Sequence, residues 1–374
     1  MKLRKGLFML CAGLSLCACS SDDETSVLDK EGAVEVTIVP PVAARALTNG
    51  STGANNQIKV TGDMYVSLTD ANGTKTKKIA SSEGIKKVKF WGVTTPQKVV
   101  VKMFGGEESY ASVDITSSLT KTMTYKDSSD ATQTDDVTFN MQADPTNIPA
   151  YGETSTITLS TRVETEEGQS YQMYDASVQL TIPVARLEVS AKRLSASSAF
   201  AQLDLKGVYL DNIKPQGNGS FTNYKHPSDN STTVEGQTNA ILSDTHNSVI
   251  PFTAESAIAP LNNQFYAYNF YGWDGDAGSE NSYKNPEVKF YFTNVTGANG
   301  NIPANQYAII KKYKNEQGNY ITLQNGKIYR IQNIELSDSN VGPVESGETI
   351  AYAVEVTVAE AVWTIETTTG EWAQ

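Results

Sequence analysis

Short segments in which apolar and polar residues alternate run through almost the whole chain, and this alternation most constrains the fold. A period of two places every second side chain on the same face of a β-strand. The segments are separated by Gly, Asn, Asp and Ser, which dominate turns, and helical periodicity is weak throughout. The clearest are Met64–Leu68, Lys98–Phe104, Thr156–Arg162, Ser177–Ile182, Leu203–Leu210, Lys289–Phe292 and Ile321–Ile331. The pattern predicts an all-β protein made of β-sandwiches.

Two Asn-Gly pairs predict tight turns between such segments. Asn325-Gly326 lies between two apolar runs, and this pair supplies the positive φ angles of a type I′ turn. We therefore expect a β-hairpin centred on it. Asn72-Gly73 is a second turn candidate.

The length of 374 residues indicates two folded domains. A boundary is expected near Pro183, because proline cannot donate a ladder hydrogen bond and a new apolar pattern begins at Ala185. The predicted division begins with a signal peptide at 1–18 and an acidic tether at 19–45 that includes a strand which proteolysis could remove. Two β-sandwiches follow at 46–182 and 183–350, and then a tail at 351–374 whose strands could be donated to another subunit.

The first residues have the form of a bacterial export signal. Three basic residues precede the apolar run Leu7–Ala18, which is too short to span a bilayer as a helix. The small residues before Cys19 resemble a lipobox, so we expect Cys19 to carry lipid (palmitate) and to anchor the protein in the outer membrane. The acidic tether Ser20–Glu24 resembles a surface-export signal of Bacteroidota lipoproteins, which would place the protein at the cell surface.

Composition excludes several functions. The net charge of −12 disfavours nucleic acid as a partner. All three Cys lie within the first 19 residues, and the two histidines, His226 and His246, are twenty positions apart. Thiol catalysis, a histidine-based triad and a zinc cluster are therefore not expected. We predict no enzyme activity, no cofactor and no metal site.

One internal repeat links the two ends of the chain. Ala33–Val39 reads AVEVTIV, and Ala353–Ala359 reads AVEVTVA. Both copies alternate as a β-strand does, so both could occupy the same place in a sheet. A chance match remains the alternative, because Val, Thr and Glu are common residues.

A protease target follows the first copy. Two prolines stop the strand, and the small-residue stretch after them contains Arg45, which a trypsin-like or arginine-specific protease would recognise. A cut between Arg45 and Ala46 would release a strand that seats Val34, Val36 and Ile38. The vacated sheet edge would then be a template for another chain.

The tail could fill that vacancy in a neighbouring subunit. Strand addition of this kind is head-to-tail and generates a filament. The apolar positions of the tail change phase after Val358, which predicts two strand segments joined by a hinge at Ala359–Val362. The alternative is that the tail is the last strand of the second domain. The expected donor residues are Val354, Val356, Val358, Trp363 and Ile365.

The order of these features resembles the Bacteroidales fimbrillins, the FimA-like or Mfa-like major subunits of type V pili. The resemblance rests on Cys19, on the strand VEVTI followed by Arg45-Ala46, on Ile182–Val189, on Gly207–Ile213, on Gly326–Ile331 and on the Val/Trp tail. It implies two transthyretin-like β-sandwiches, export as a surface lipoprotein, cleavage after Arg45 and polymerisation by donor-strand exchange. It also implies partners: other pilins, and a receptor on a host or bacterial surface for adhesion.

The sequence leaves two other functions open. The aromatic stretch Phe265–Trp273 could stack on sugar rings, although its aromatic residues occupy both faces of a strand, which favours core packing or contact between subunits. A monomeric surface lipoprotein that binds glycans or host proteins is therefore the main alternative. A surface glycoside hydrolase ranks third, because paired carboxylates in a cleft leave no sequence signature.

Overall fold

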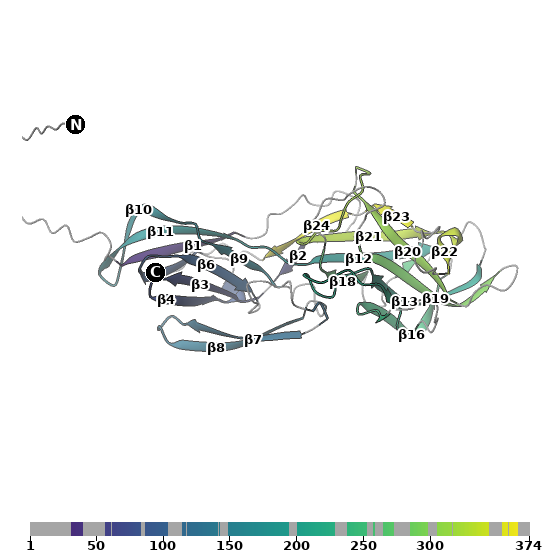
Figure 1. The fold of residues 1–374 in the computed structure, drawn as a ribbon, viewed down its shortest axis with the longest axis horizontal. Helices are drawn as coiled ribbons and strands as arrows, with labels where there is room; N and C mark the ends of the chain where they lie inside the picture. The colour runs from purple at the N-terminus through teal and green to yellow at the C-terminus, as the bar shows by residue number, and fades with distance from the viewer. Residues whose placement is uncertain are drawn as a thin grey trace, which may run out of the picture.

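The computed structural model contains two β-sandwich lobes along one long axis (Figure 1). It describes residues 31–39, 57–60, 62–83, 87–103, 114–116, 118–140, 142, 149–193, 200–228, 238–252, 257–258, 265–272, 285–297, 305–315, 317–343, 354–357 and 359–365. Within these ranges the only helical segments are two 3-10 turns, Ser81–Glu83 and Asp338–Asn340. None of the described helices could cross a membrane. The expected all-β sandwich fold is confirmed.

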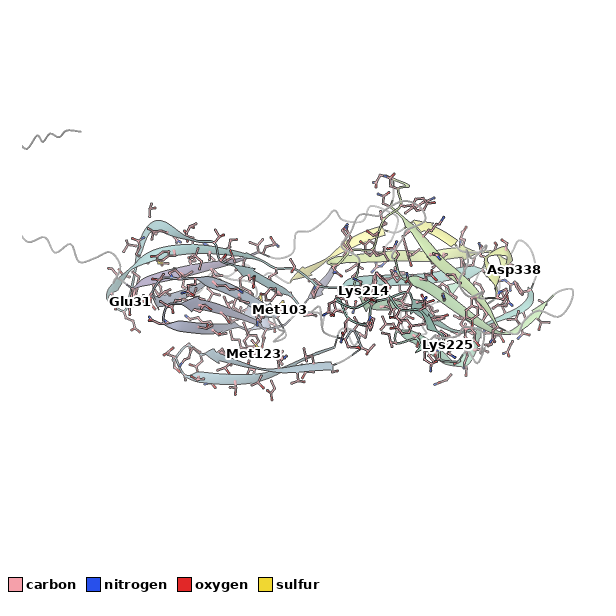
Figure 2. The ribbon with its side chains drawn as sticks, in the orientation of Figure 1. Glu31, Met103, Met123, Lys214, Lys225 and Asp338 are labelled. Carbon is pink, nitrogen blue, oxygen red and sulfur yellow. The ribbon has the colours of Figure 1, made fainter. Side chains whose placement is uncertain are left out.

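Two sheets form the first lobe. The four-stranded sheet has the order β10 (Ile157–Glu166), β11 (Gln169–Gln179), β1 (Gly32–Val39) and β5 (Val88–Val93). The six-stranded sheet has the order β8 (Thr132–Asn140), β7 (Ser118–Lys126), β4 (Gly73–Ile79), β3 (Met64–Asp70), β6 (Lys98–Met103) and β9 (Tyr151–Thr154). The β7–β8 hairpin, marked by Met123 in Figure 2, forms the edge of this sheet, where Lys126 of β7 pairs with Lys77 of β4.

The alternating sequence fills the space between these two sheets. Val34, Val36 and Ile38 of β1 belong to one buried cluster with Val66 of β3 and Val101 of β6. Burying one such side chain contributes roughly 1.5–3 kcal/mol. The first lobe therefore depends on β1 for one face of its core.

The second lobe has the same layered construction. One sheet contains β17 (Ala257–Ile258) and β18 (Tyr266–Phe270) beside β12 (Ala185–Arg193), followed by β21 (Lys327–Leu336), β24 (Ala359–Ile365) and β2 (Gln57–Val60). The other has the order β16 (Ser243–Pro251), β13 (Phe200–Asp211), β19 (Glu287–Gly297) and β20 (Gln306–Lys314), with β22 (Val341–Gly342) and β23 (Val354–Thr357) both paired to β20. A small ladder joins β14 (Tyr224–Lys225) and β15 (Thr238–Asn239).

The strand β2 joins the two halves of the sequence. It lies inside the range predicted for the first domain, yet it pairs with β24 in a sheet of the second lobe. Pro183 lies between the last strand of the first lobe and β12. The boundary at this proline remains a prediction.

The expected hairpin around Asn325-Gly326 is wrong. Gly326 has a positive φ of 78°, but residues 321–324 form no strand before it. Neighbouring loops hold this segment instead: Asn325 Oδ1 accepts a hydrogen bond from Gly272 N, and Leu323 N donates to Asn285 Oδ1. The other predicted turn is confirmed, since Gly73 lies at the tip of the β3–β4 hairpin.

The two lobes meet at a small hydrogen-bonded junction. Gln142 Nε2 donates to the carbonyl oxygens of Ile115 (3.1 Å) and Asn269 (2.6 Å), and Asn269 N donates back to Gln142 Oε1 (3.1 Å). Ile115 N also donates to Pro215 O of the second lobe. Asn269 is fully buried. Gln142 therefore ties a loop of the first lobe to β18 of the second.

We predict that Gln142→Ala destabilises the protein by about 1–3 kcal/mol, because it takes away the acceptor of a buried backbone N–H. Denaturant unfolding measures this free energy, and limited proteolysis reports whether the lobes separate. Gln133→Ala, at an exposed glutamine of the β7–β8 hairpin, is the matched control and should change stability by less than about 0.5 kcal/mol. Equal effects of the two substitutions would contradict a specific role for the junction.

Candidate functional site

The strand β1 is internal to its sheet. It pairs in parallel with β11 along its whole length, from Gly32 opposite Gln172 to Val39 opposite Gln179. On its other edge it pairs antiparallel with β5, and Val34 lies opposite Phe90. Both edges of β1 are therefore hydrogen-bonded. Figure 1 shows β1 beside β11. A chain without β1 would leave two unpaired strand edges.

The inner face of β1 carries the three side chains expected from the sequence. Val34 and Val36 are fully buried, and Ile38 is 5% exposed. On the outer face Ala33 packs in a small apolar cluster with Tyr171 and Met173, and Trp91 lies against this cluster. The strand is therefore covered on both faces near its beginning.

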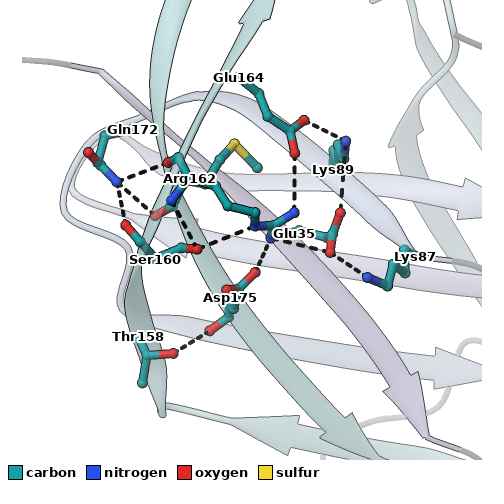
Figure 3. Close-up of polar contacts among 10 residues, drawn as sticks. Glu35, Lys87, Lys89, Thr158, Ser160, Arg162, Glu164, Gln172 and Asp175 are labelled. Carbon is teal, nitrogen blue, oxygen red and sulfur yellow. Dashed lines mark hydrogen bonds and ion pairs between the residues drawn. The ribbon is translucent and has the colours of Figure 1, made fainter.

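A carboxylate lies in the middle of this strand. Glu35 points from the outer face and is only 6% exposed. Its Oε1 accepts hydrogen bonds from Lys87 Nζ at 2.7 Å and from Arg162 Nη2 at 3.4 Å, and its Oε2 lies 3.8 Å from Lys89 Nζ (Figure 3). Lys87 and Lys89 come from the β5 side of β1, whereas Arg162 reaches from β10 across β11. Three cations from both sides of β1 thus meet one carboxylate.

Two further carboxylates complete this cluster. Glu164 accepts from Lys89 at 2.6 Å and from Arg162 at 3.2 Å, and Asp175 of β11 is paired with the same arginine. Lys89 and Arg162 therefore have partners besides Glu35. We call the set Glu35, Lys87, Lys89, Arg162, Glu164 and Asp175 the β1 charge cluster. It contains three cations and three carboxylates.

The cluster stabilises the ionised form of Glu35. Burial by itself would raise the pKa of this carboxyl, but the hydrogen bond from Lys87 and the positive charges of Lys87 and Arg162 outweigh it. The pKa therefore lies below its ordinary value of 4.5. A carboxyl whose pKa is lowered by folding stabilises the folded state at higher pH, and this contribution is lost as the pH falls through the lowered value.

The alternation in the sequence does not indicate the charge cluster. A polar residue of an alternating strand, such as Glu35, normally faces solvent. The signal was present in the repeat, because both copies carry a glutamate at the same place, Glu35 and Glu355. Its cationic partners are more than fifty residues away in sequence, so spacing alone could not reveal them.

The predicted donor residues lie in the second lobe. Val354 and Val356 belong to β23, which pairs in parallel with β20, and Trp363 and Ile365 belong to β24, which pairs with β21 and β2. Val358 lies outside the described residues. Within one chain, the removable strand and the tail are thus in different lobes.

The predicted hinge is misplaced. Ala359–Val362 lies within β24, and β23 ends before it at Thr357. The two strands belong to different sheets, β23 to the sheet of β20 and β24 to the sheet of β21. Two strand segments do form, as the phase change indicated. The lipidation residue Cys19 and the cleavage pair Arg45 and Ala46 lie outside the described residues.

The aromatic stretch is largely core. Tyr266, Tyr268, Phe270 and Tyr271 are all less than 5% exposed, so these four rings offer no open platform for a sugar. Burial raises the pKa of the Tyr268 hydroxyl, which donates to Asp244 at 2.7 Å. Trp273 lies outside the described residues.

Comparison with known proteins gave matches among solved structures alone. No protein-family model matches the chain, and no curated protein matches it. A candidate cell adhesion protein from Bacteroides eggerthii is 14% identical, with a TM-score of 0.48, over 91% of this chain and 99% of that one. The fimbrilin FimA from Porphyromonas gingivalis W83 is 12% identical, with a TM-score of 0.47, over 91% of this chain and 100% of that one.

At identities of 14% and 12% and TM-scores below 0.5, these two structures do not indicate what this chain does. The function proposed below therefore rests on the residues and pairings of this chain.

We predict that Glu35→Gln destabilises the protein at neutral pH, by about 1 kcal/mol, because one carboxylate leaves a partly exposed cluster of charges. The difference between wild type and variant should shrink as the pH falls from 4.5 through the lowered pKa of Glu35, because the wild-type carboxyl then becomes neutral, as the glutamine amide is. Denaturant unfolding at pH 7 and at successively lower pH values measures this difference. A difference that does not change with pH would show that the charge of Glu35 contributes nothing.

Proposed function

We propose that the protein is a non-catalytic structural subunit of a cell-surface fimbria. In this proposal the chain is exported as an outer-membrane lipoprotein anchored through Cys19. An arginine-specific or trypsin-like protease then cuts between Arg45 and Ala46. The tail of one subunit next enters the place of β1 in another, which builds a head-to-tail polymer that supports adhesion.

The observation that carries this proposal is the position of β1. It is the first of the described strands and an internal strand of its sheet, and the predicted cut lies after its last residue, Val39. Its loss would free the facing edges of β5 and β11 and uncover the places of Val34, Val36 and Ile38. Open edges beside an apolar groove favour the binding of another strand.

The tail has the sequence that such a groove requires. Val354 and Val356 repeat the alternation of Val34 and Val36, and the residues between and around them are the same. Among the described strands β23 has one neighbour, β20, so its release breaks a ladder on one edge only. A contact between the tail of one copy and the groove of the next does not close on itself, so it generates a filament.

Cleavage at residue 45 should control assembly. We predict that Arg45→Lys resists an arginine-specific protease and stays monomeric with it, whereas trypsin cuts this variant and yields the same polymer ladder as wild type. The ladder is read on a gel without heating, beside size-exclusion chromatography. The substitution keeps the positive charge, so it separates cutting from charge. Polymerisation of the uncut variant would overturn the proposal, and binding of a polysaccharide by a permanent monomer would favour the glycan-binding alternative.

The anchor is tested separately. We predict that Cys19→Ser moves the protein from the membrane fraction to the soluble fraction, because lipid chains on this residue supply the attachment. Fractionation and metabolic labelling with a palmitate analogue report this change. Cys17→Ser is the matched control and should keep the label. Membrane attachment that persists in Cys19→Ser would disprove the anchor.

A further inference from the structure

The proposed strand exchange requires that the incoming strand pair with β5 and β11 in one register, and the β1 charge cluster bears on which register this is. Because side chains alternate with a period of two, a slip of one residue turns the apolar face away from the core. A slip of two residues does not. In the tail, Val354, Val356 and Val358 are interchangeable at the apolar places of β1. After a slip of two residues, two of the three apolar places therefore still receive a valine. The apolar mismatch is confined to one place, with Glu360 at the place of Ile38 or Tyr352 at the place of Val34.

The charges also distinguish these registers. When β1 leaves, Glu35 leaves with it, and the cluster retains Lys87, Lys89 and Arg162 against two carboxylates, Glu164 and Asp175. This leaves one net positive charge beside the groove. In the register that follows the repeat, Glu355 takes the place of Glu35 and compensates that charge.

A two-residue slip in either direction loses this match. It moves Glu355 by roughly 6–7 Å along the strand, given a rise of about 3.3 Å per residue. In one direction the carboxylate would enter the place of Ala33, beside the apolar side chains of Tyr171, Met173 and Trp91. There the carboxylate would lie against apolar side chains and would be displaced from its place among the three cations, and burial of a carboxylate against apolar groups is costly. In the other direction Ala353 would face the three cations.

We infer that Lys87, Lys89 and Arg162 form a carboxylate-binding site in the groove, and that its ligand is Glu355 of a second copy of this chain. The site sets the register of the donor strand. This inference rests on the proposed strand exchange and adds the residues that specify it.

The repeat also shows where the match ends. In this register Tyr352 would take the place of Gly32, where a β-carbon would lie 2.7 Å from the ring of Tyr174 and 3.0 Å from Gln172 O. The donor strand therefore pairs from Ala353 onward, with Tyr352 outside the sheet.

Cross-linking tests the register directly. The chain has no cysteine after residue 19, so introduced cysteines report single contacts. Thr37 lies opposite Ser177, and Val39 lies opposite Gln179. In the inferred register Thr357→Cys in the donor therefore meets Ser177→Cys in the acceptor, whereas a two-residue slip brings it to Gln179→Cys. Ser177 and Gln179 are both exposed, which makes them matched positions.

The experiment uses the full chain, cut with an arginine-specific protease and oxidised during assembly. We expect the Thr357→Cys and Ser177→Cys pair to cross-link at least tenfold more than the Thr357→Cys and Gln179→Cys pair. Glu355→Gln should reduce this ratio toward one. Lys89→Gln should do the same from the acceptor side, and combining the two substitutions should have no further effect. Thermal unfolding of each uncut variant confirms that it is folded.

The outcomes separate the two ideas. Polymers that form with equal cross-linking of both pairs, or with a ratio that Glu355→Gln leaves unchanged, overturn the carboxylate-binding site and leave strand exchange intact. Failure of every variant, wild type included, to polymerise after cutting overturns strand exchange and this inference with it.

Discussion

The structure of the first lobe depends on a strand that is hydrogen-bonded on both edges. An edge strand can be lost at the expense of one ladder. Loss of an internal strand such as β1 leaves two open ladders and a gap in the core at Val34, Val36 and Ile38. Unpaired backbone groups next to exposed apolar side chains are unfavourable in water. Any form of this protein that lacks β1 therefore has a strong drive to acquire a replacement strand.

Much of the fold could be predicted from the sequence, because it follows from local pattern. Alternation of apolar and polar residues identified the segments that became β3, β6, β13 and β19. The same alternation selected Val34, Val36 and Ile38 as inward-facing residues. These inferences succeed because strand period and turn chemistry act over a few residues.

The remaining features depend on contacts between distant segments. The Asn325-Gly326 turn is shaped by Gly272 and Asn285 rather than by a strand before it. The two strands β23 and β24 belong to different sheets. The partners of Glu35 come from β10 and from the β5 side of the sheet. No local pattern indicates which residues a fold brings together, so these features required the structure.

The pairing of β2 with β24 has a consequence for the order of events at maturation. The strand β1 lies in one lobe, and the next described strand along the chain, β2, lies in the other and flanks β24. In the proposed function, one cut after Arg45 would break the covalent connection between β1 and β2. The cut that allows β1 to leave would then also leave β2 held beside β24 only by the four-residue pairing between these two strands. The cut would therefore prepare a subunit both to accept a donor strand and to donate its own tail. A subunit that is still uncut would do neither.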